Sequence, residues 1–188
     1  MSELVTIRHA TLADAKRILE IYTPYILNTA ITFEYKVPAL EEFTVRMQNT
    51  LARYPYLVAL INEQIVGYAY ASSFKSRAAY DWSVETSIYV DKQYKGIGIG
   101  TKLYLALESL LKKQNICNLC ACIAYPNPES ISFHESFGYT TCAHFHKSGY
   151  KQNTWYDMIW MEKTLCEHTE HPPEFIPFPK LTDISIKQ

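Results

Sequence analysis

The sequence predicts a mixed α/β fold in one domain, with a mostly antiparallel sheet and helices on both of its faces. Segments with helical apolar spacing alternate with short segments rich in β-branched residues. Their order is a strand, two helices, a run of strands, and then helices alternating with strands. A length of 188 residues suits a single core. We expect residues 1–165 to form the domain and residues 166–188 a proline-containing C-terminal tail.

The first part of the domain combines one strand with two helices. Residues 4–8 are typical of a short strand, and Thr11 is a suitable N-cap for a helix over residues 12–22. A second amphipathic helix is predicted by four apolar residues at helical spacing, namely Leu40, Phe43, Met47 and Leu51.

Three strands follow in the middle of the chain. Residues 56–61 and 65–71 are predicted to pair as a hairpin, because only the polar residues 62–64 separate them. Residues 83–90, which are rich in β-branched side chains, form the third strand of this series.

Helices and strands alternate in the last part of the domain. A helix ending near Lys113 is marked by Leu103, Leu107, Leu110 and Leu111. A strand over residues 118–125 precedes Asn127, which is a good N-cap for a short helix that begins at Pro128 and ends before Gly138.

Two further strands and an irregular tail complete the chain. The strands are predicted over residues 140–145 and 154–163. From Cys166 onward the sequence becomes polar, and four of the nine prolines fall between residues 172 and 179. We expect this tail to lie on the surface of the domain or on a partner subunit.

Composition excludes several classes of partner. The formal net charge of −1 lacks the basic surplus expected of a nucleic-acid-binding protein. No apolar run approaches the roughly 20 residues that span a bilayer, and the first residues lack the apolar core of a secretion signal. With five cysteines, an odd number, we expect a cytoplasmic protein with reduced thiols and no membrane partner.

The chemistry begins in a glycine-rich stretch between a predicted strand and a predicted helix. This stretch consists of Lys95, Gly96, Ile97, Gly98, Ile99, Gly100 and Thr101. Glycine at every second position leaves the backbone N–H groups unobstructed, so they can converge on an anion at the positive end of the helix. The lysine adds a cation at the mouth of the loop.

Three kinds of phosphate-binding loop contain glycines in a pattern of this type. The stretch lacks the spacing of a Walker loop and of a dinucleotide-binding fingerprint. It fits the [QR]-x-x-G-x-[GA] loop with which acyltransferases grip the pyrophosphate of coenzyme A. Residues 95–100 fit with lysine in the first place, and residues 93–98 fit literally. We prefer the first register because it places Gly100 and Thr101 at the helix start; an ordinary glycine-rich turn is the alternative.

Longer blocks of sequence resemble the GNAT superfamily of N-acetyltransferases, and more narrowly its phosphinothricin and methionine sulfoximine N-acetyltransferases. The blocks are residues 30–34, 53–58, 79–90, 126–139 and 149–157. The glycine loop is common to all GNAT proteins, whereas the segment from Ala79 to Glu85 and that from Asn127 to His134 are more specific. The resemblance extends over nearly the whole chain, including the tail.

This resemblance implies a fold, a co-substrate and the residues that hold it. The sheet would contain a splayed strand pair, and the backbone of Ile88, Tyr89 and Val90 would pair with the pantetheine arm of acetyl-CoA. Residues 95–101 would hold the pyrophosphate, and Asn127 and Ser130 would hydrogen-bond the cofactor. The family also implies a homodimer.

Catalysis requires a base and an acid. An amine near neutral pH is mostly ammonium, so a base must remove a proton before it can attack. By the resemblance Glu85 is this base and His134 is the acid that assists departure of the CoA thiolate, where many GNAT proteins use a tyrosine. Taken alone, Glu85 is equally consistent with a solvated strand residue, and His134 with a histidine packed on a helix face.

The resemblance also indicates where an amino-acid-like amine would bind. Arg77 occupies the position of a family arginine, and a guanidinium suits a substrate carboxylate, although a plain surface cation is the alternative. Further candidates for the substrate pocket are Phe33, Glu34, Tyr80 and Lys151. Residues 152–154 depart from the family pattern, so the acceptor pocket is expected to differ.

Other functions are less consistent with the sequence. Zinc binding is suggested by Cys117, Cys120, Cys122, Cys142, His144 and His146. A spacing of three on a strand directs side chains to opposite faces, however, so we expect no metal. An enzyme that is acylated on a cysteine would need a Cys-His-Asp grouping, and the sequence shows none. A non-catalytic acyl-CoA sensor and a protein acetyltransferase remain as alternatives.

Overall fold

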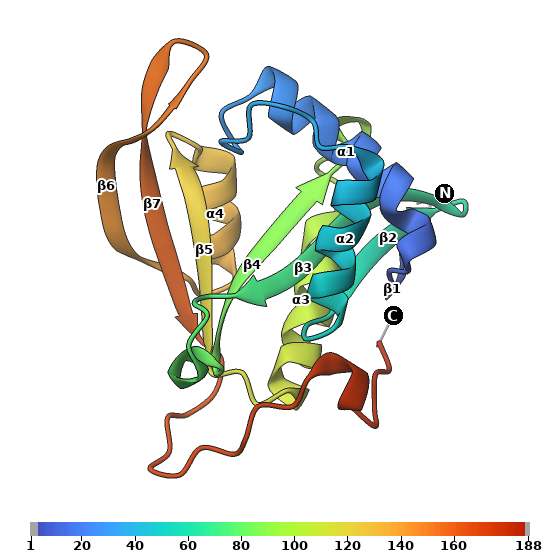
Figure 1. The fold of residues 1–188 in the computed structure, drawn as a ribbon, viewed down its shortest axis with the longest axis vertical. Coiled ribbons are helices and arrows are strands. Elements are labelled where there is room, and N and C mark those ends of the chain that lie inside the picture. The colour runs from blue at the N-terminus through green and yellow to red at the C-terminus, as the bar shows by residue number, and fades with distance from the viewer. Residues whose placement is uncertain (1–3, 187–188) are drawn as a thin grey trace.

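Seven strands form one sheet in the order β1-β2-β3-β4-β5-β7-β6 (Figure 1). The strands are β1 (Thr6–His9), β2 (Tyr56–Ile61), β3 (Gln64–Ser73), β4 (Ser83–Val90), β5 (Asn118–Tyr125), β6 (Thr140–Lys151) and β7 (Thr154–Thr164). The helices are α1 (Ala15–Asn28), α2 (Leu40–Leu51), α3 (Ile99–Lys113) and α4 (Pro128–Ser136). Short 3-10 turns are η1 (Leu12–Asp14), η2 (Ala78–Tyr80), η3 (Lys92–Tyr94) and η4 (Phe178–Lys180).

The computed structural model describes residues 4–186, so the first three residues of the expected domain and the last two of the expected tail lie outside it. Every pair of neighbouring strands is antiparallel except β4 and β5, which are parallel. The prediction of a mixed, mostly antiparallel sheet is therefore confirmed. In the part of the chain that the structure describes, no helix is long and apolar enough to cross a membrane.

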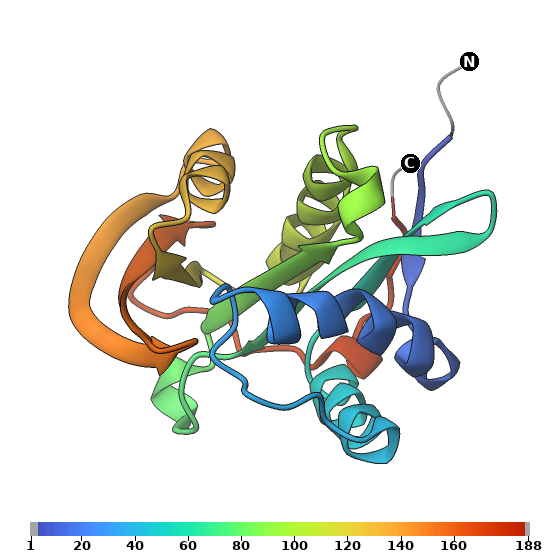
Figure 2. The same cartoon turned by 90° about the horizontal axis from the view of Figure 1, so that it is seen from above.

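Helices cover both faces of the sheet. Figure 2 shows α1 and α2 on one side, and α3 and α4 on the other. The first face packs through Ile18, Ile26 and Met47, and the second through Leu103 and Leu107, all of which are almost completely buried. The buried residues Phe43 and Met47 of α2, like Leu103 and Leu107 of α3, are one helical turn apart, so the apolar spacing that predicted each helix also determines which side of it meets the sheet.

The hairpin β2–β3 has a two-residue turn. Asn62 and Glu63 both have positive φ, at 48° and 65°. Two consecutive left-handed residues are typical of a type I′ turn, whose twist matches that of the flanking strands. The predicted hairpin is confirmed, with the second strand starting at Gln64.

The first helix differs from its prediction at both ends. Thr11 begins the 3-10 turn η1, where its backbone N–H donates to the Asp14 carboxylate at 2.8 Å. The α-helix then extends to Asn28 and contains Pro24. Buried residues continue beyond the predicted end at Tyr22, since Tyr25 and Ile26 extend the same apolar face. Packing of this face offsets the backbone hydrogen bond that proline removes.

Strand β6 is longer than predicted and irregular. It continues past Phe145 to Lys151, because pairing with β7 resumes at Gly149↔Tyr156 after a bulge. Most of its side chains are exposed. The alternation of buried and exposed residues that reveals a strand in a sequence is therefore weak here.

The C-terminal tail lies on the surface of its own chain. The Gln114 side-chain amide donates to the carbonyls of Arg53 at 2.7 Å and Ile176 at 2.8 Å, and the Phe178 backbone N–H donates to Arg53 O at 2.9 Å. These bonds attach the tail to the end of α3 and to the segment that precedes β2.

Candidate active site

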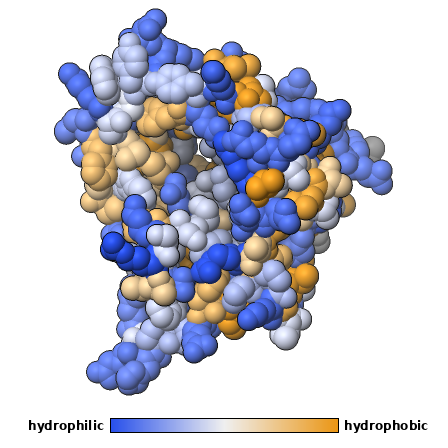
Figure 3. Space-filling view, in the orientation of Figure 1, coloured by the Kyte–Doolittle hydropathy of each residue, from blue (hydrophilic) through white to orange (hydrophobic). Residues whose placement is uncertain are grey.

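The sheet opens between its two parallel strands. Strands β4 and β5 pair only at Ser83↔Asn118, Val84↔Leu119 and Glu85↔Cys120. Beyond these pairs β4 continues beside β3, and β5 continues beside β7. Figure 1 shows the two strands separating, and the space-filling view in the same orientation is hollowed between the two sides of the molecule (Figure 3).

A cavity of about 730 Å³ lies beside the separated strands. Its walls come from the end of β4, the glycine loop, the first turn of α3 and the start of α4. A second cavity of about 60 Å³ adjoins it between β4 and β5. The two cavities share the lining residues Ile31, Ile88, Asn127 and Ser130.

The glycine loop brings the N-terminus of α3 to the large cavity. Gly96 and Gly98 have φ of +80° and +84°, and an added Cβ at either position would meet nothing within 4 Å. Backbone conformation, rather than crowding, therefore requires glycine at both positions. Gly98 is the N-cap of the helix, so unpaired backbone N–H groups of the first turn lie at the cavity wall.

The other loop residues have separate roles. Gly100 lies in the first turn of α3, where an added Cβ would be 3.1 Å from the Phe133 ring, so it permits close packing of α4. The helix begins at Ile99, one residue before the predicted start at Gly100, and Thr101 also lines the cavity. Ile97 is 53% exposed and is not among the cavity-lining residues.

The loop cation has an acidic partner. Lys95 Nζ lies 3.2 Å from Glu129 Oε2 of α4, and both side chains line the cavity. The two side chains are 45% and 82% exposed, so water screens the pair and weakens it. An anionic ligand would compete with this glutamate for the lysine.

Strand β4 presents an unpaired edge to the opening. The Asp91 N–H donates to Val66 O at 2.8 Å, and ladder bonds alternate along an antiparallel pair. The amides of Ile88 and Val90 therefore point away from β3, toward β5, whereas the amide of Tyr89 is directed to β3. The Val90 carbonyl already accepts the Tyr25 hydroxyl at 2.5 Å.

Helix α4 begins with a capped turn at the edge of both cavities. The Asn127 side-chain oxygen accepts the Ser130 N–H at 3.2 Å, as predicted for its N-cap. Its amide nitrogen can donate, and Asn127 lines both cavities. The Asn127 and Ser130 side chains are thus positioned by the helix terminus that they form.

His134 is buried, and both of its ring nitrogens have partners. Nδ1 lies 2.7 Å from the Ser130 carbonyl and Nε2 lies 2.9 Å from the Tyr104 hydroxyl. Because a carbonyl only accepts, Nδ1 carries the proton and Nε2 accepts from Tyr104. Burial lowers the pKa of His134, so its neutral form is favoured. The Tyr104 hydroxyl also lies 3.2 Å from Thr86 Oγ1. Sequence reasoning missed Tyr104, whose position matches an ordinary apolar helix residue.

Glu85 lies where the two strands part, on the face opposite His134. Its neighbour Thr86 points toward α3, so the alternation of a strand places Glu85 on the α1–α2 face. Burial raises the pKa of Glu85, and the nearby Lys75 partly opposes this shift. Glu85 is not among the residues that line either of the two cavities.

A cluster of aromatic side chains lies on the same face of the sheet as Glu85. The Phe74 ring is 5.2 Å from Trp160 and 5.9 Å from Tyr80, measured between centroids. Lys75 Nζ lies 5.8 Å from the Trp160 ring centroid. Of these four residues only Tyr80 was predicted; Phe74 and Lys75 are adjacent in sequence, Trp160 lies far away on β7, and no shared motif links them.

Arg77 stands at the start of η2, close to this group in sequence. Its side chain is exposed, and within residues 4–186 no hydrogen bond or ion pair involves it. The guanidinium therefore retains all its donors for a ligand.

The connection between α1 and α2, residues 29–39, is clamped to the β6–β7 hairpin. The buried Lys151 ammonium donates to Thr32 O at 2.7 Å, and the Tyr35 hydroxyl donates to Tyr150 O. The Phe33 ring packs directly against Gly149, where an added Cβ would overlap it. These contacts occur within a single chain.

Glu34, in the same connection, is committed to neighbouring side chains. Its carboxylate accepts hydrogen bonds from Tyr22 at 3.1 Å and Arg46 at 2.9 Å. Lys151 and Glu34 thus hold the loop in place, because the charged group of each side chain is hydrogen-bonded to a neighbouring residue.

In this structure the sheet parts beside a glycine loop, and a helix N-terminus and an unpaired strand edge face one cavity. This arrangement defines a class of protein, the acyltransferases that bind an acyl-coenzyme A between splayed strands. Residues 7–160 match the family described as Acetyltransferase (GNAT) domain, and the chain belongs to this family of acetyltransferases.

Named relatives indicate which members of this family the chain resembles. The chain is 34% identical to phosphinothricin N-acetyltransferase of Streptomyces viridochromogenes, over 85% of this chain and 87% of the relative. It is 33% identical to L-methionine sulfoximine/L-methionine sulfone acetyltransferase of Salmonella typhimurium, over 87% and 96%.

A solved structure has the same fold. The phosphinothricin acetyltransferase of Sinorhizobium meliloti, in complex with AcCoA, superposes with a TM-score of 0.87 at 33% identity. The match covers 98% of this chain and 100% of the other. The resemblance inferred from the sequence is confirmed.

Proposed function

We propose that this protein transfers the acetyl group of acetyl-CoA to the amine of a small, amino-acid-like substrate of the phosphinothricin or methionine sulfoximine type. The observation that carries the proposal is the large cavity, which joins the α3 N-terminus to the unpaired edge of β4 at Ile88 and Val90. Glu85 lies further back on the same strand, at the last β4–β5 pair. The named relatives act on substrates of this kind.

Each part of acetyl-CoA has a chemically matched partner in this proposal. The pyrophosphate binds the N–H groups at residues 96–101, and Lys95 supplies a cation. The pantetheine arm pairs with the amides of Ile88 and Val90, as an added strand would. The Asn127 amide donates to the same arm. The amide of Tyr89 is directed to β3, so this residue acts through its ring, which packs against Tyr22, Tyr25 and Tyr68 beside the arm.

Glu85 acts as the base. It takes a proton from the substrate ammonium, directly or through a water molecule, and frees the nitrogen lone pair. The raised pKa of Glu85 suits this task, because a carboxylate with a higher pKa is a stronger base. The nitrogen then attacks the thioester carbonyl, and a C–N bond forms as the C–S bond breaks.

His134 supplies the proton that the departing thiolate takes. The neutral ring has both nitrogens engaged, so this role requires the doubly protonated ring. In that form Nε2–H donates to the hydroxyl of Tyr104, which also lines the small cavity, so the proton reaches the thiolate through this hydroxyl: Tyr104 gives up its own proton and takes the one from Nε2. Because burial lowers the pKa of His134, its contribution should increase as pH falls.

The amine substrate is held on the Glu85 face. Arg77 pairs with its carboxylate, and Tyr80 with Phe74 and Trp160 forms an apolar wall for its side chain. Phe33 and Glu34 belong to the loop that closes this space, and Lys151 acts by fixing that loop through Thr32 rather than by binding substrate.

We also propose a cytoplasmic homodimer in which residues 1–165 form the catalytic domain. Five free cysteines support a reducing compartment. Tyr35, Tyr150 and Trp155 are 65%, 43% and 58% exposed and suit a subunit interface. Light scattering should give twice the chain mass, and Trp155→Ser should lower it; a monomeric wild type would contradict the proposal.

The function is tested by measuring free CoA release with a panel of amines. We expect acetyl-CoA consumption with phosphinothricin, methionine sulfoximine or related amino acids, and none with their N-blocked forms. Acetyl-CoA binding without thiol release from any amine would instead indicate a sensor. Release with peptides alone would indicate a protein acetyltransferase. Absence of acetyl-CoA binding in calorimetry would contradict the assignment of the glycine loop.

A further inference from the structure

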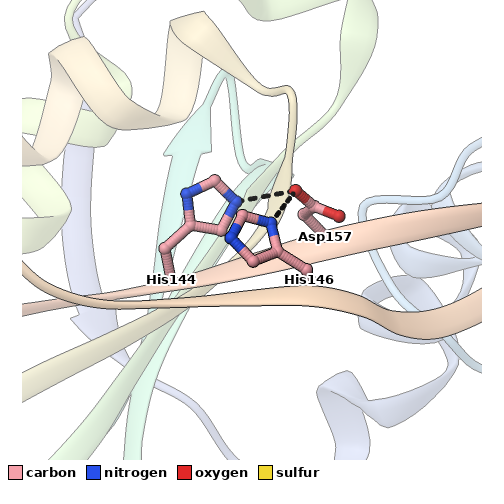
Figure 4. A group of neighbouring side chains, drawn as sticks. All are labelled: His144, His146 and Asp157. Atoms are coloured by element: carbon pink, nitrogen blue, oxygen red, sulfur yellow. Dashed lines mark hydrogen bonds and ion pairs between the residues drawn. The ribbon is translucent and has the colours of Figure 1, made fainter.

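Two histidines and one aspartate converge at the bulge of β6 (Figure 4). His144 Nε2 and His146 Nδ1 both contact the same atom, Asp157 Oδ2, at 2.7 Å and 3.0 Å. One potential ligand atom from each of the three residues lies within 4.8 Å of the others. Both imidazoles therefore converge on a single carboxylate oxygen from the neighbouring strand.

The irregular backbone of β6 creates this convergence. Between the pairs Phe145↔Met158 and Gly149↔Tyr156, residues 146–148 stand opposite the single residue Asp157. Bulges of this kind redirect side chains and are common beside functional sites. Lys147 adopts a positive φ of 48°, a conformation that costs free energy for a residue with a Cβ.

The same bulge orients the carboxylate. The Lys147 backbone N–H donates to Asp157 Oδ1 at 2.8 Å, which leaves Oδ2 directed at the two rings. Metal-binding carboxylates are commonly held by such an additional hydrogen bond. The left-handed Lys147 thus contributes its backbone to the cluster, and its side chain is not required.

We propose that His144, His146 and Asp157 bind a divalent transition-metal ion such as Zn²⁺, Ni²⁺ or Cu²⁺. Imidazole nitrogen with one carboxylate oxygen suits these ions, whereas Mg²⁺ and Ca²⁺ prefer oxygen ligands alone. Tetrahedral coordination at about 2.1 Å separates ligand atoms by about 3.4 Å. The present His–Asp separations of 2.7 Å and 3.0 Å must widen slightly to reach this geometry, and the third separation, between the two imidazole nitrogens, lies within 4.8 Å.

The site is accessible from solvent. The side chains of His144, His146 and Asp157 are 37%, 77% and 25% exposed. Three protein ligands leave a fourth position for water. The Asp157 position pairs with Tyr125 of β5, whose ring lies 5.1 Å from that of His144. The ion would join β6 to β7 next to the strand that leads into Asn127, and its effect would be on the stability of this end of the sheet.

This proposal replaces the expectation, drawn from the sequence, that the chain binds no metal. In the sequence the two histidines stand near cysteines, whereas Asp157 belongs to the next strand and no local motif joins it to them. In residues 4–186 this is the only group of three or more His, Cys, Asp or Glu residues with ligand atoms close enough to share an ion.

The first experiment is calorimetric titration of the full chain with Ni²⁺ in a buffer that does not chelate metals. We expect one ion per chain for the wild type. Affinity should fall about 10-fold or more in His146→Ala and in Asp157→Asn. His168→Ala is the matched control, because it removes an exposed histidine of the tail, and it should bind as the wild type does.

Asp157→Asn removes the carboxylate charge and leaves one acceptor oxygen where two are used, so the melting temperature without metal should fall. The increase that Ni²⁺ produces, measured from each chain's own metal-free value, should disappear in the variant, and this difference separates metal binding from a purely structural role. An Asp157→Asn chain that retains the full Ni²⁺-induced increase would overturn the proposal.

Cysteines are the competing ligands. Cys117 and Cys166 lie with their sulfur atoms 2.8 Å apart and could bind a soft ion. The visible and near-ultraviolet spectrum of the Co²⁺-loaded chain distinguishes the two sites. We expect d–d bands without the intense charge-transfer absorption of cobalt–thiolate bonds. A thiolate spectrum, or binding that is unchanged in His146→Ala, would show that the ion goes elsewhere and would refute the site.

Discussion

Glu85 and Cys120 are the last residues through which β4 and β5 pair. Beyond them the β5-facing amides of Ile88 and Val90 lose their strand partner. The same point in the sheet therefore provides an edge that an extended ligand can complete and places a half-buried carboxylate beside it. The proposed cofactor arm and the proposed base are adjacent because one strand pairing ends.

Substituting Glu85 tests its role as the base. Glu85→Gln should lower kcat by about 10²- to 10⁴-fold and leave acetyl-CoA affinity unchanged. The wild-type rate should rise with pH through the raised pKa of Glu85, above the ordinary range of a glutamate, and the variant should lose this limb. Glu162→Gln is the control, since Glu162 pairs with Cys120 from its other side. Steady-state kinetics with an unchanged kcat for Glu85→Gln would exclude the mechanism.

The ion pair of Lys95 and Glu129 predicts a variant that binds the cofactor more tightly. Glu129→Gln removes a negative charge from the wall of the large cavity and frees Lys95, so the Kd for acetyl-CoA should fall. Lys95→Ala should raise it. Glu135→Gln changes an exposed glutamate of the same helix and should have little effect. Calorimetry at low ionic strength, where screening is weakest, measures the Kd of each variant for acetyl-CoA. If Lys95→Ala and the wild type bound acetyl-CoA equally well, Lys95 would have no role in cofactor binding.

Gly149 and Phe33 predict a coupled pair of substitutions. Gly149→Ala should displace the Phe33 ring and raise KM for the amine, because the new Cβ overlaps that ring. In a Phe33→Ala background the same substitution should have little further effect. A double-mutant cycle on KM gives the coupling. Additive effects would mean that the alanine acts through some other contact.

Arg77 predicts a selective effect on carboxylated substrates. Arg77→Ala should raise KM for amines that carry a carboxylate and leave KM unchanged for matched amines without one. The comparison of the two substrate series is the internal control. An equal fall in kcat for both series would contradict a role in carboxylate binding.

His134 predicts a pH dependence of stability. Its pKa is lowered in the folded chain, while an unfolded histidine titrates near 6.5. Between these values the unfolded chain binds a proton that the folded chain does not, so stability falls as pH falls through this window and then levels off below the folded pKa.

The measurement is the melting temperature from pH 7.5 to pH 4.5 for the wild type and for His134→Gln. The variant should show a smaller loss on the acid side, whatever its stability at neutral pH. Comparing the two curves cancels the contributions of other groups, such as Glu85. Parallel curves would mean that His134 does not titrate differently on folding.

Several elements were predictable because their signals are local. Strands β4 and β5 have their predicted ends, helix α2 begins and ends at the first and last of the four apolar residues that predicted it, and Asn127 caps α4 as expected. Alternation, helical spacing and N-cap chemistry act within a few residues, so they can be read without knowing the rest of the fold.

Other features depended on partners that are distant in the sequence. The extension of α1 beyond Tyr22 follows from packing, and the extension of β6 follows from renewed pairing with β7 after the bulge. Similarly, the commitment of Lys151 to Thr32 and of His134 to Tyr104 joins residues about 30 or more positions apart.

By itself, the sequence determined the fold class, the family and the glycine loop, because these reside in periodicity and in contiguous motifs. Tertiary structure decided which amides of β4 are free, which nitrogen of His134 carries the proton, and that Asp157 joins His144 and His146. Hydrogen bonds and close contacts depend on distance and direction in space. Strand pairing, and above all the point where two strands stop pairing, sets those distances.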